Sequence, residues 1–363
     1  MPDGLILVTS WPGQPSVAQL EREAREGLRP RTDYVELAHR LDAAVVDADY
    51  MRHRSSQPAR IAARIGGLAH GQVIEALVRG PRCRWVLAWA DHLGFRLAAA
   101  SKLLRRRMKL VVVSGRLATP KKRFLLGPLA LHTHIDAIVN YSSVQRDIGI
   151  EFGVPPEKLH LLLQPVDEEF WQPDGEGDPN MVCAVGYEAR DYDTLLAAIR
   201  GLPVRLEVAV GSSVLAGARG RVGDLGAVDD GRVAVHRQLP HSALRDLYAR
   251  SRIVVVPLKD VDQDAGVTVI TEALAMAKPV VVTQSHGQVD IVRDGENGTL
   301  VPPGDPAAMR AALERLLADQ AACQLMGRAG RRLVCEGHTL ERYVEALAET
   351  VSRAASPSCR ELP

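Results

Sequence analysis

Two carboxylates, Asp264 and Glu272, are separated by seven residues and mark the stretch of the sequence best suited to chemistry. Between them, Gly266 precedes a segment of helical character, and a glycine there lets the backbone approach a ligand closely. The first N–H groups of a helix attract anions such as a diphosphate. Glu272, about one turn into this helix, can accept two hydrogen bonds from the vicinal diol of a ribose. The structural alternative is that Gly266 only makes a turn and Glu272 only complements the helix dipole.

Several common kinds of site are absent from the sequence. It contains no G-x-x-x-x-G-K-[ST] phosphate loop, no G-x-G-x-x-G after its first expected strand and no G-x-S-x-G elbow. These absences argue against a P-loop NTPase, a classical NAD dehydrogenase and a serine hydrolase. The five cysteines form no C-x-x-C pair, and no H-x-x-x-H or H-E-x-x-H pattern occurs, so we expect neither a disulfide framework nor a zinc site.

Charge and hydropathy argue against a nucleic-acid-binding, a membrane-spanning and an exported protein. The 363 residues include 45 Lys and Arg and 44 Asp and Glu, and a formal net charge of +1 argues against nucleic acid as the main partner. Residues 1–172 carry 24 basic and 18 acidic side chains (+6), and the remainder carries 21 and 26 (−5). Apolar runs are far shorter than the roughly 20 residues of a membrane span, and no signal peptide is apparent. We therefore expect a cytoplasmic protein.

Short apolar runs alternate with amphipathic stretches along the whole chain, which is typical of parallel sheets covered by helices on both faces. The expected strands are residues 5–9, 43–47, 85–89, 109–113, 137–140, 181–185, 205–210, 233–236, 253–257, 279–283 and 299–301. The expected helices are residues 17–27, 34–40, 59–77, 93–106, 123–131, 192–200, 242–251, 268–277, 306–319 and 341–353.

The pattern of alternation repeats, which predicts two α/β domains. Proline, glycine and acidic residues dominate residues 172–179, which is the chemistry of a linker. We expect an N-terminal domain over residues 1–172, a second domain over residues 173–335, and a C-terminal helix within residues 336–363. Ligands of such sheets bind at the carboxyl ends of the strands.

Residues 253–305 resemble the donor-sugar site of retaining nucleotide-sugar glycosyltransferases with two Rossmann-like domains, the GT-B fold of glycosyltransferase family four. The hallmark is two acids with seven residues between them, here Asp264 and Glu272, followed by Glu-Ala-Leu-Ala-Met-Ala-Lys-Pro-Val-Val from position 272. The glycine-containing loop at residues 285–290 and the run at residues 294–305 also match. The resemblance implies two parallel-sheet domains facing each other across a cleft, and a C-terminal helix within residues 336–363 that packs back on the N-terminal domain.

The resemblance also implies roles for particular residues. Asp264 would bind hydroxyls of the donor sugar and Glu272 the ribose. Helix N–H groups at Val267 and Thr268 would stabilise the departing diphosphate. The remaining donor-side candidates are Gly266, and Gly186 after the first strand of the second domain, with Arg190 and Lys259 as the cations on the diphosphate.

Several positions depart from the family pattern. The first acid is usually Glu, and here it is Asp264, one methylene shorter. The family's Arg and Lys on the diphosphate are replaced by Tyr187 and Tyr192, which is why Arg190 and Lys259 are assigned instead. The histidine that many relatives place near the acceptor is absent.

Three residues of the N-terminal half are candidates for the acceptor side. Trp11 can stack on an acceptor ring or simply pack in the core. Asp91 can orient an acceptor hydroxyl or cap a helix. Arg116 can meet an acidic acceptor.

The implied activity is transfer of a hexosyl group from a nucleoside-diphosphate sugar to a hydroxyl of a small molecule or glycolipid, with retention and without a metal ion or other cofactor. Two alternatives stay open: a weak or inactive sugar-nucleotide-binding homologue, favoured by the altered Asp264 loop, and a nucleotide-sugar 2-epimerase. Basic runs at residues 105–109 and 121–123 suggest peripheral contact of the N-terminal domain with the inner face of a membrane. The alternative is a solvated basic face.

Overall fold

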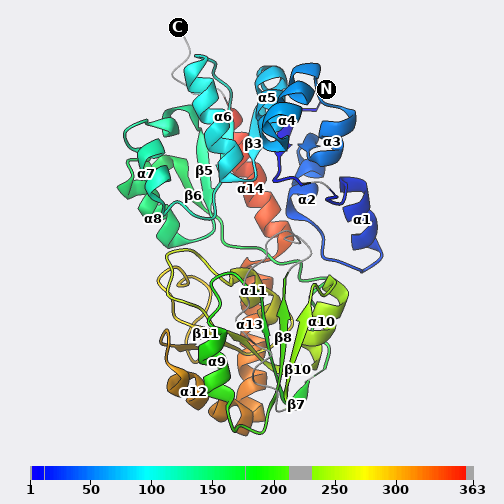
Figure 1. Ribbon diagram of the computed structural model, residues 1–363, viewed down its shortest axis with the longest axis vertical. Helices are drawn as coiled ribbons and strands as arrows, with labels where there is room; N and C mark the ends of the chain where they lie inside the picture. The colour runs from blue at the N-terminus through cyan, green and yellow to red at the C-terminus, as the bar shows by residue number, and fades with distance from the viewer. Residues whose placement is uncertain (1, 12, 176, 212–230, 357–363) are drawn as a thin grey trace. The chain divides into compact units, whose positions relative to one another are not determined.

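The computed structural model describes residues 2–11, 13–175, 177–211 and 231–356. The chain divides into two compact units. Unit 1 takes residues up to 22, residues 31–163 and residues from 341 onward, and unit 2 takes residues 23–30 and 164–340. Each unit contains one parallel six-stranded sheet flanked by helices (Figure 1).

The sheet of unit 1 has the strand order β2-β1-β3-β4-β5-β6, and every neighbouring pair is parallel. Its strands are β1 (Gly4–Leu7), β2 (Ala43–Val46), β3 (Trp85–Ala88), β4 (Leu110–Val113), β5 (Ala137–Asn140) and β6 (Leu159–Leu161). Its helices are α1 (Val17–Arg25, whose last turn counts with unit 2), α2 (Asp33–Arg40), α3 (Ala48–His53), α4 (Gln57–Gly66), α5 (Leu68–Arg79), α6 (Asp91–Leu103), α7 (Pro120–Leu126), α8 (Ser143–Glu151) and α14 (Leu340–Ala355). Four of the strands are buried along their whole length, so their continuous apolar runs reflect cover on both faces.

The sheet of unit 2 has the order β12-β11-β10-β7-β8-β9 and is also parallel throughout. Its strands are β7 (Asp178–Val185), β8 (Arg205–Val210), β9 (Val233–Arg237), β10 (Ser251–Val256), β11 (Val280–Thr283) and β12 (Gly298–Val301). Its helices are α9 (Tyr192–Ile199), α10 (His241–Arg250), α11 (Val267–Ala275), α12 (Pro306–Ala318) and α13 (Gln320–Gly337). The carboxyl ends of β7, β10 and β11 are therefore neighbours.

The expected alternation of strands and helices is present, with corrections. The single helix expected over residues 59–77 is broken into α4 and α5 at Gly67, which has a φ of +84° that ends a regular helix. The strand β6 and the helices α3, α8 and α13 were not expected. Helix α13 carries apolar residues on one face, but glycines at positions 327 and 330 interrupt that pattern in the sequence.

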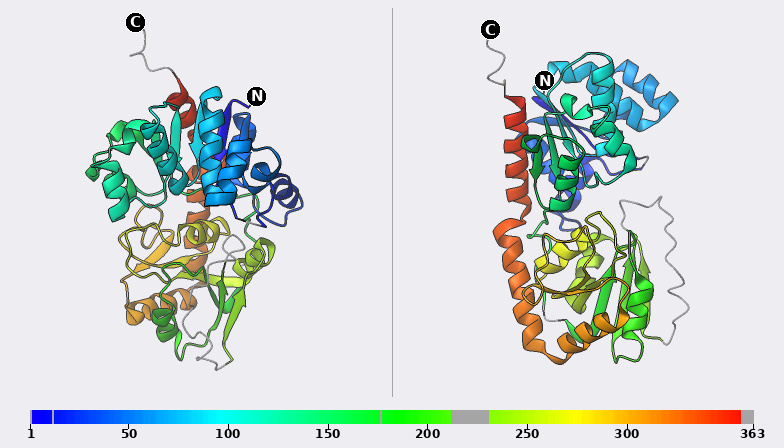
Figure 2. Two further views of the ribbon diagram at one scale, coloured as in Figure 1. Left: turned by 45° about the horizontal axis from the view of Figure 1, so that its top comes forward. Right: turned by 90° about the vertical axis from the view of Figure 1, so that its left-hand side faces the viewer.

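The units depart from the expected domain limits at two places. Residues 164–172 belong to unit 2, where Trp171 is fully buried with its ring 5.6 Å from that of Tyr248. Residues 336–340 also belong to unit 2, and α14 belongs to unit 1 from its second residue, Glu341, onward. Tyr343 on α14 contacts the rings of Trp89 and Tyr141, and Figure 2 shows the helix, in red, alongside the strands of unit 1. Burial of aromatic rings, rather than linker composition, sets these limits.

No helix among the described residues is long and apolar enough to cross a membrane.

Candidate functional site

Three loops follow the carboxyl ends of the neighbouring strands β7, β10 and β11 in unit 2. They are residues 186–190, 257–266 and 285–290, and hydrogen bonds join them. Gln263 Nε2 donates to Glu188 Oε1 over 3.1 Å, and the backbone N–H of Gly287 donates to Val261 O over 2.9 Å, which ties the third loop to the second. This edge of a parallel sheet is where ligands of α/β domains bind.

Gly266 provides the turn that starts helix α11. It adopts a φ of +81° at the N-cap, and a β-carbon built on it would lie 2.7 Å from Cγ1 of Val256. Only glycine meets both demands, because side chains disfavour a positive φ and no space exists for a methyl group. The helix then presents its free N–H groups next to the three loops, with Val267 buried and Thr268 exposed.

Gly266→Ala is expected to destabilise unit 2 and disturb the start of α11. Gly304→Ala is the matched control, because Gly304 has a φ of +65° with nothing within 4 Å of an added β-carbon. The control measures backbone strain alone, about 1 kcal/mol. Thermal unfolding should show a larger loss for Gly266→Ala, and equal losses in both variants would contradict the packing argument.

Arg190 is a buried cation beside two glycines. Its Nε donates to Val185 O and its Nη1 to Glu188 O, each over 2.9 Å. β-Carbons built on Gly186 and Gly266 would lie 2.6 Å and 3.4 Å from its guanidinium nitrogens, so the two glycines leave the room that it fills. Among the described residues it forms no ion pair, and burial lowers the pKa of the guanidinium. A buried cation bonded only to carbonyls is suited to an anionic ligand.

Glu272 lies on α11 and is only 9% exposed. Its Oε2 accepts a hydrogen bond of 2.9 Å from the hydroxyl of Tyr248, which is itself fully buried on α10. Its Oε1 has no hydrogen-bond partner among the described residues, and this oxygen is not completely buried. Burial raises the pKa of Glu272 from 4.5 to about 8. One carboxylate oxygen is thus held in place, and the other is available to a ligand.

The raised pKa of Glu272 predicts that the free energy of unfolding depends on pH. Between pH 4.5 and about 8 the folded chain keeps a proton that the unfolded chain has released, so stability falls as pH rises through this range, by about 1.4 kcal/mol per pH unit for one proton. Glu272→Gln keeps an acceptor for Tyr248 but removes this titration. Urea unfolding should show equal stabilities near pH 4.5 and a more stable variant at pH 8. The same difference in stability between wild type and Glu272→Gln at both pH values would contradict this prediction.

Asp264 lies half-buried in the loop after β10. Its Oδ1 accepts a hydrogen bond of 2.8 Å from Nε2 of Gln288, in the loop after β11. Burial, and then the negative charge of Asp290, raise the pKa of Asp264 to about 8, while the bond from Gln288 opposes that rise. Two carboxyl groups and an amide therefore meet at this corner of the site.

The structure brings the donor-side residues of the sequence analysis into one region of unit 2. Lys259 is exposed at its rim, and its backbone N–H donates to Ala189 O over 2.9 Å. Tyr192 donates from its hydroxyl to Gly186 O, which holds the backbone of the first loop. Sequence reasoning gave no role to Tyr248 or Gln288. Neither carries a local signal, because each acts through a partner that is distant in sequence.

The acceptor-side candidates lie in unit 1, after the ends of β1, β3 and β4. Asp91, the first residue of α6, pairs with Lys122 Nζ over 2.5 Å and accepts from Ser114 Oγ over 3.3 Å. It is not the N-cap, which is Ala90, so the expected alternative of a capping role is wrong. Arg116 is exposed and Trp11 is half-buried.

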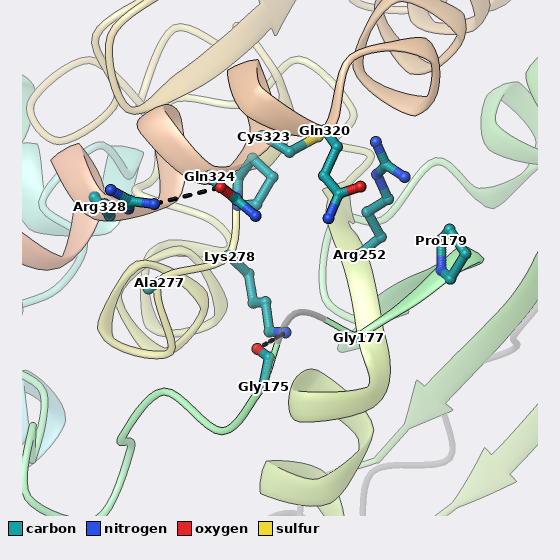
Figure 3. A pocket seen from close by; sticks show the side chains of 11 residues that line it. Gly175, Gly177, Pro179, Arg252, Ala277, Lys278, Gln320, Cys323, Gln324 and Arg328 are labelled. Carbon is teal, nitrogen blue, oxygen red and sulfur yellow. Dashed lines mark hydrogen bonds between the residues drawn. The ribbon is translucent and has the colours of Figure 1, made fainter.

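A pocket of about 360 Å³ in unit 2 lies away from these loops (Figure 3). Its lining includes Pro179, Arg252 and Pro279, at the amino ends of β7, β10 and β11. Lys278, which also lines the pocket, donates a hydrogen bond from Nζ to Gly175 O over 3.2 Å. The pocket thus lies at the opposite edge of the sheet and is not part of the candidate site.

A model of the family described as "Glycosyl transferases group 1" matches residues 181–319, which hold all three loops and α11. This part of the chain is a group 1 glycosyltransferase domain. Among curated proteins it is 34% identical over 83 residues to the putative glycosyltransferase EpsD of Bacillus subtilis, covering 23% of this chain and 22% of that protein. It is 29% identical over 225 residues to the GDP-mannose-dependent alpha-(1-6)-phosphatidylinositol monomannoside mannosyltransferase of Mycolicibacterium smegmatis, covering 55% and 58%. The chain thus spans about a fifth and about three fifths of these relatives' lengths.

Solved structures share the fold over nearly the whole chain. HepE of Anabaena in complex with UDP-glucose aligns with a TM-score of 0.70 at 15% identity, covering 96% of this chain and 99% of that chain. Sucrose-phosphate synthase of Thermosynechococcus elongatus aligns with a TM-score of 0.70 at 16% identity, covering 98% and 100%. With two parallel six-stranded sheets, the chain has the expected GT-B fold.

Proposed function

We propose that this glycosyltransferase moves a hexosyl group from a nucleoside-diphosphate sugar to a hydroxyl acceptor, with retention of configuration at the anomeric carbon. The observation that carries the proposal is the buried Arg190 guanidinium, which forms no ion pair among the described residues and lies beside Gly186 and Gly266 at the start of α11. The UDP-glucose bound to HepE and the GDP-mannose dependence named for the mycobacterial relative support a nucleotide-sugar donor.

In the proposed reaction the bond from the anomeric carbon to the diphosphate oxygen breaks, and the acceptor oxygen bonds to that carbon on the same face. The acceptor proton passes to the departing diphosphate oxygen. Arg190, Lys259 and the N–H groups of Val267 and Thr268 stabilise the charge that develops on the diphosphate. Glu272 holds the ribose and Asp264 holds hydroxyls of the donor sugar.

We propose that this chemistry needs no metal ion. The charge of the diphosphate is met by the two cations and by the positive end of α11, so the residues of the site supply the electrostatic stabilisation themselves. Activity that persists in an excess of chelator would support this point, and activity restored only by a divalent cation would overturn it.

We propose that unit 1 takes the acceptor, a small molecule or a glycolipid. Trp11, Asp91 and Arg116 follow neighbouring strands at the ligand-binding edge of its sheet. A contact with an anionic membrane is supported by α7, where Phe124 is 54% exposed next to Arg123. Co-sedimentation with phosphatidylglycerol vesicles tests the contact, and equal recovery with neutral vesicles would speak against it.

The proposed activity is tested by incubating the full chain with a panel of UDP- and GDP-sugars and acceptors and measuring released UDP or GDP. Acceptor-dependent release, with an α-linked product from an α-linked donor, supports the proposal. Thermal shifts with nucleotides but no release would favour the non-catalytic binder that the altered Asp264 loop suggests. A nucleotide sugar changed only at its second carbon would identify an epimerase.

A further inference from the structure

The loop at residues 285–290 is fixed against the loop after β10 by contacts on both sides. The backbone N–H of His286 donates to Asp260 Oδ1 over 3.0 Å, and its Nδ1 lies 2.8 Å from the same oxygen. Gly287 donates to Val261 O over 2.9 Å, and a β-carbon built on it would lie 2.1 Å from Gln263 O. The two backbones therefore touch, and the next side chain, Gln288, starts from a defined position.

The amide of Gln288 can take only one orientation. Its Nε2 donates to Asp264 Oδ1 over 2.8 Å and to Ala265 O over 3.3 Å. The carbonyl oxygen of Ala265 can only accept, so turning the amide over would place oxygen against oxygen whatever the protonation state of Asp264. Gln288 is 3% exposed, and this burial makes the orientation costly to change.

When Asp264 is ionised, this orientation leaves one acceptor oxygen on each side chain of the hydrogen-bonded pair. Oε1 of Gln288 and Oδ2 of Asp264 have no hydrogen-bond partner among the described residues. Neither oxygen is completely buried, so a ligand can reach both. The two side chains are joined through Nε2 and Oδ1, so the free oxygens lie on the same amide–carboxylate pair. A ligand that donates two hydrogen bonds from neighbouring positions, as a vicinal diol does, satisfies both.

We propose that Gln288 determines donor specificity together with Asp264, and that the pair recognises two neighbouring hydroxyl groups on the donor sugar. The inference rests on the proposed function, because it takes the sugar of the donor to lie at this corner. A donor that lacks one of the two hydroxyls leaves a buried acceptor unpaired, which costs far more than the loss of a methylene contact.

The first test uses the wild-type chain and its parent donor beside analogues that each lack one hydroxyl of the hexose. The expected result is that two analogues with neighbouring deletions lose about 10- to 100-fold in kcat/KM, while the others change little. Equal turnover of all analogues, or losses at hydroxyls that are not neighbours, would overturn the inference. If the wild type releases no nucleotide from any donor, the proposed function itself fails.

The second test is Gln288→Leu, with Gln284→Leu as the matched control on the exposed residue after β11. We expect Gln288→Leu to lose about 10- to 100-fold on the parent donor and to lose nothing more on the analogue that lacks the matching hydroxyl. Gln284→Leu should behave like wild type. A uniform loss on every donor, with discrimination intact, would show a merely structural role. Gln288→Asn, which keeps the amide on a shorter chain, should restore part of the discrimination if Gln288→Leu folds poorly.

Discussion

Glu272→Ala is expected to weaken the binding of UDP or GDP and to lower kcat/KM together, each by about 10- to 100-fold. Tyr248 holds one carboxylate oxygen from within the core and leaves the other free, so the side chain is already oriented before a nucleotide binds. Ribose hydroxyls that donate to Glu272 favour its ionised form, whose hydrogen bonds are roughly twice as strong as neutral ones. The loss falls on substrate and transition state alike, because the ribose does not change during the reaction.

Isothermal titration with UDP and GDP, followed by donor kinetics, measures this effect. Glu314→Ala is the control, since Glu314 is an exposed carboxylate on α12. Nucleotides that lack the ribose 2′-hydroxyl add a sharper test: wild type should bind them less tightly than the ribonucleotides, and Glu272→Ala should bind both alike. Unchanged affinity in the variant would show that its carboxylate only supports the fold.

Arg190→Met is expected to lower kcat by about 10²- to 10³-fold, with a smaller loss in nucleotide affinity. The guanidinium lies where the diphosphate would meet the start of α11, and charge on that diphosphate grows as the sugar leaves. Methionine has a similar length and no charge, so it fills the space between Gly186 and Gly266 without a buried cation. Removing an unpaired buried charge also favours the folded state, so stability should not fall in step with activity.

Stopped assays of nucleotide release and thermal unfolding on the same preparation test this prediction. Arg328→Met removes an exposed cation on α13 and should leave kcat unchanged. Arg190→Lys should recover part of the rate, because it returns the charge without the planar fork. A proportional loss of melting temperature and rate would show that Arg190 acts mainly through its bonds to Val185 O and Glu188 O.

The part of the site that is continuous in sequence could be predicted in detail. Asp264, Gly266 and Glu272 lie on one loop and the helix that follows it, so their spacing already fixes which of them share a turn. The break between α4 and α5 was readable in principle from Gly66-Gly67, but the apolar periodicity on either side hid it.

The sequence by itself determined the alternation of buried strands and helices, the parallel sheets and the residues around α11, because these follow from local periodicity and from chemistry within one turn. Only the tertiary structure decided which distant groups meet them. Parallel strands that are neighbours in the sheet are far apart in the chain, so Tyr248 on α10 and Gln288 after β11 reach the site through sheet order and packing. Their burial, and with it their charge and orientation, comes from neighbours that no local pattern specifies.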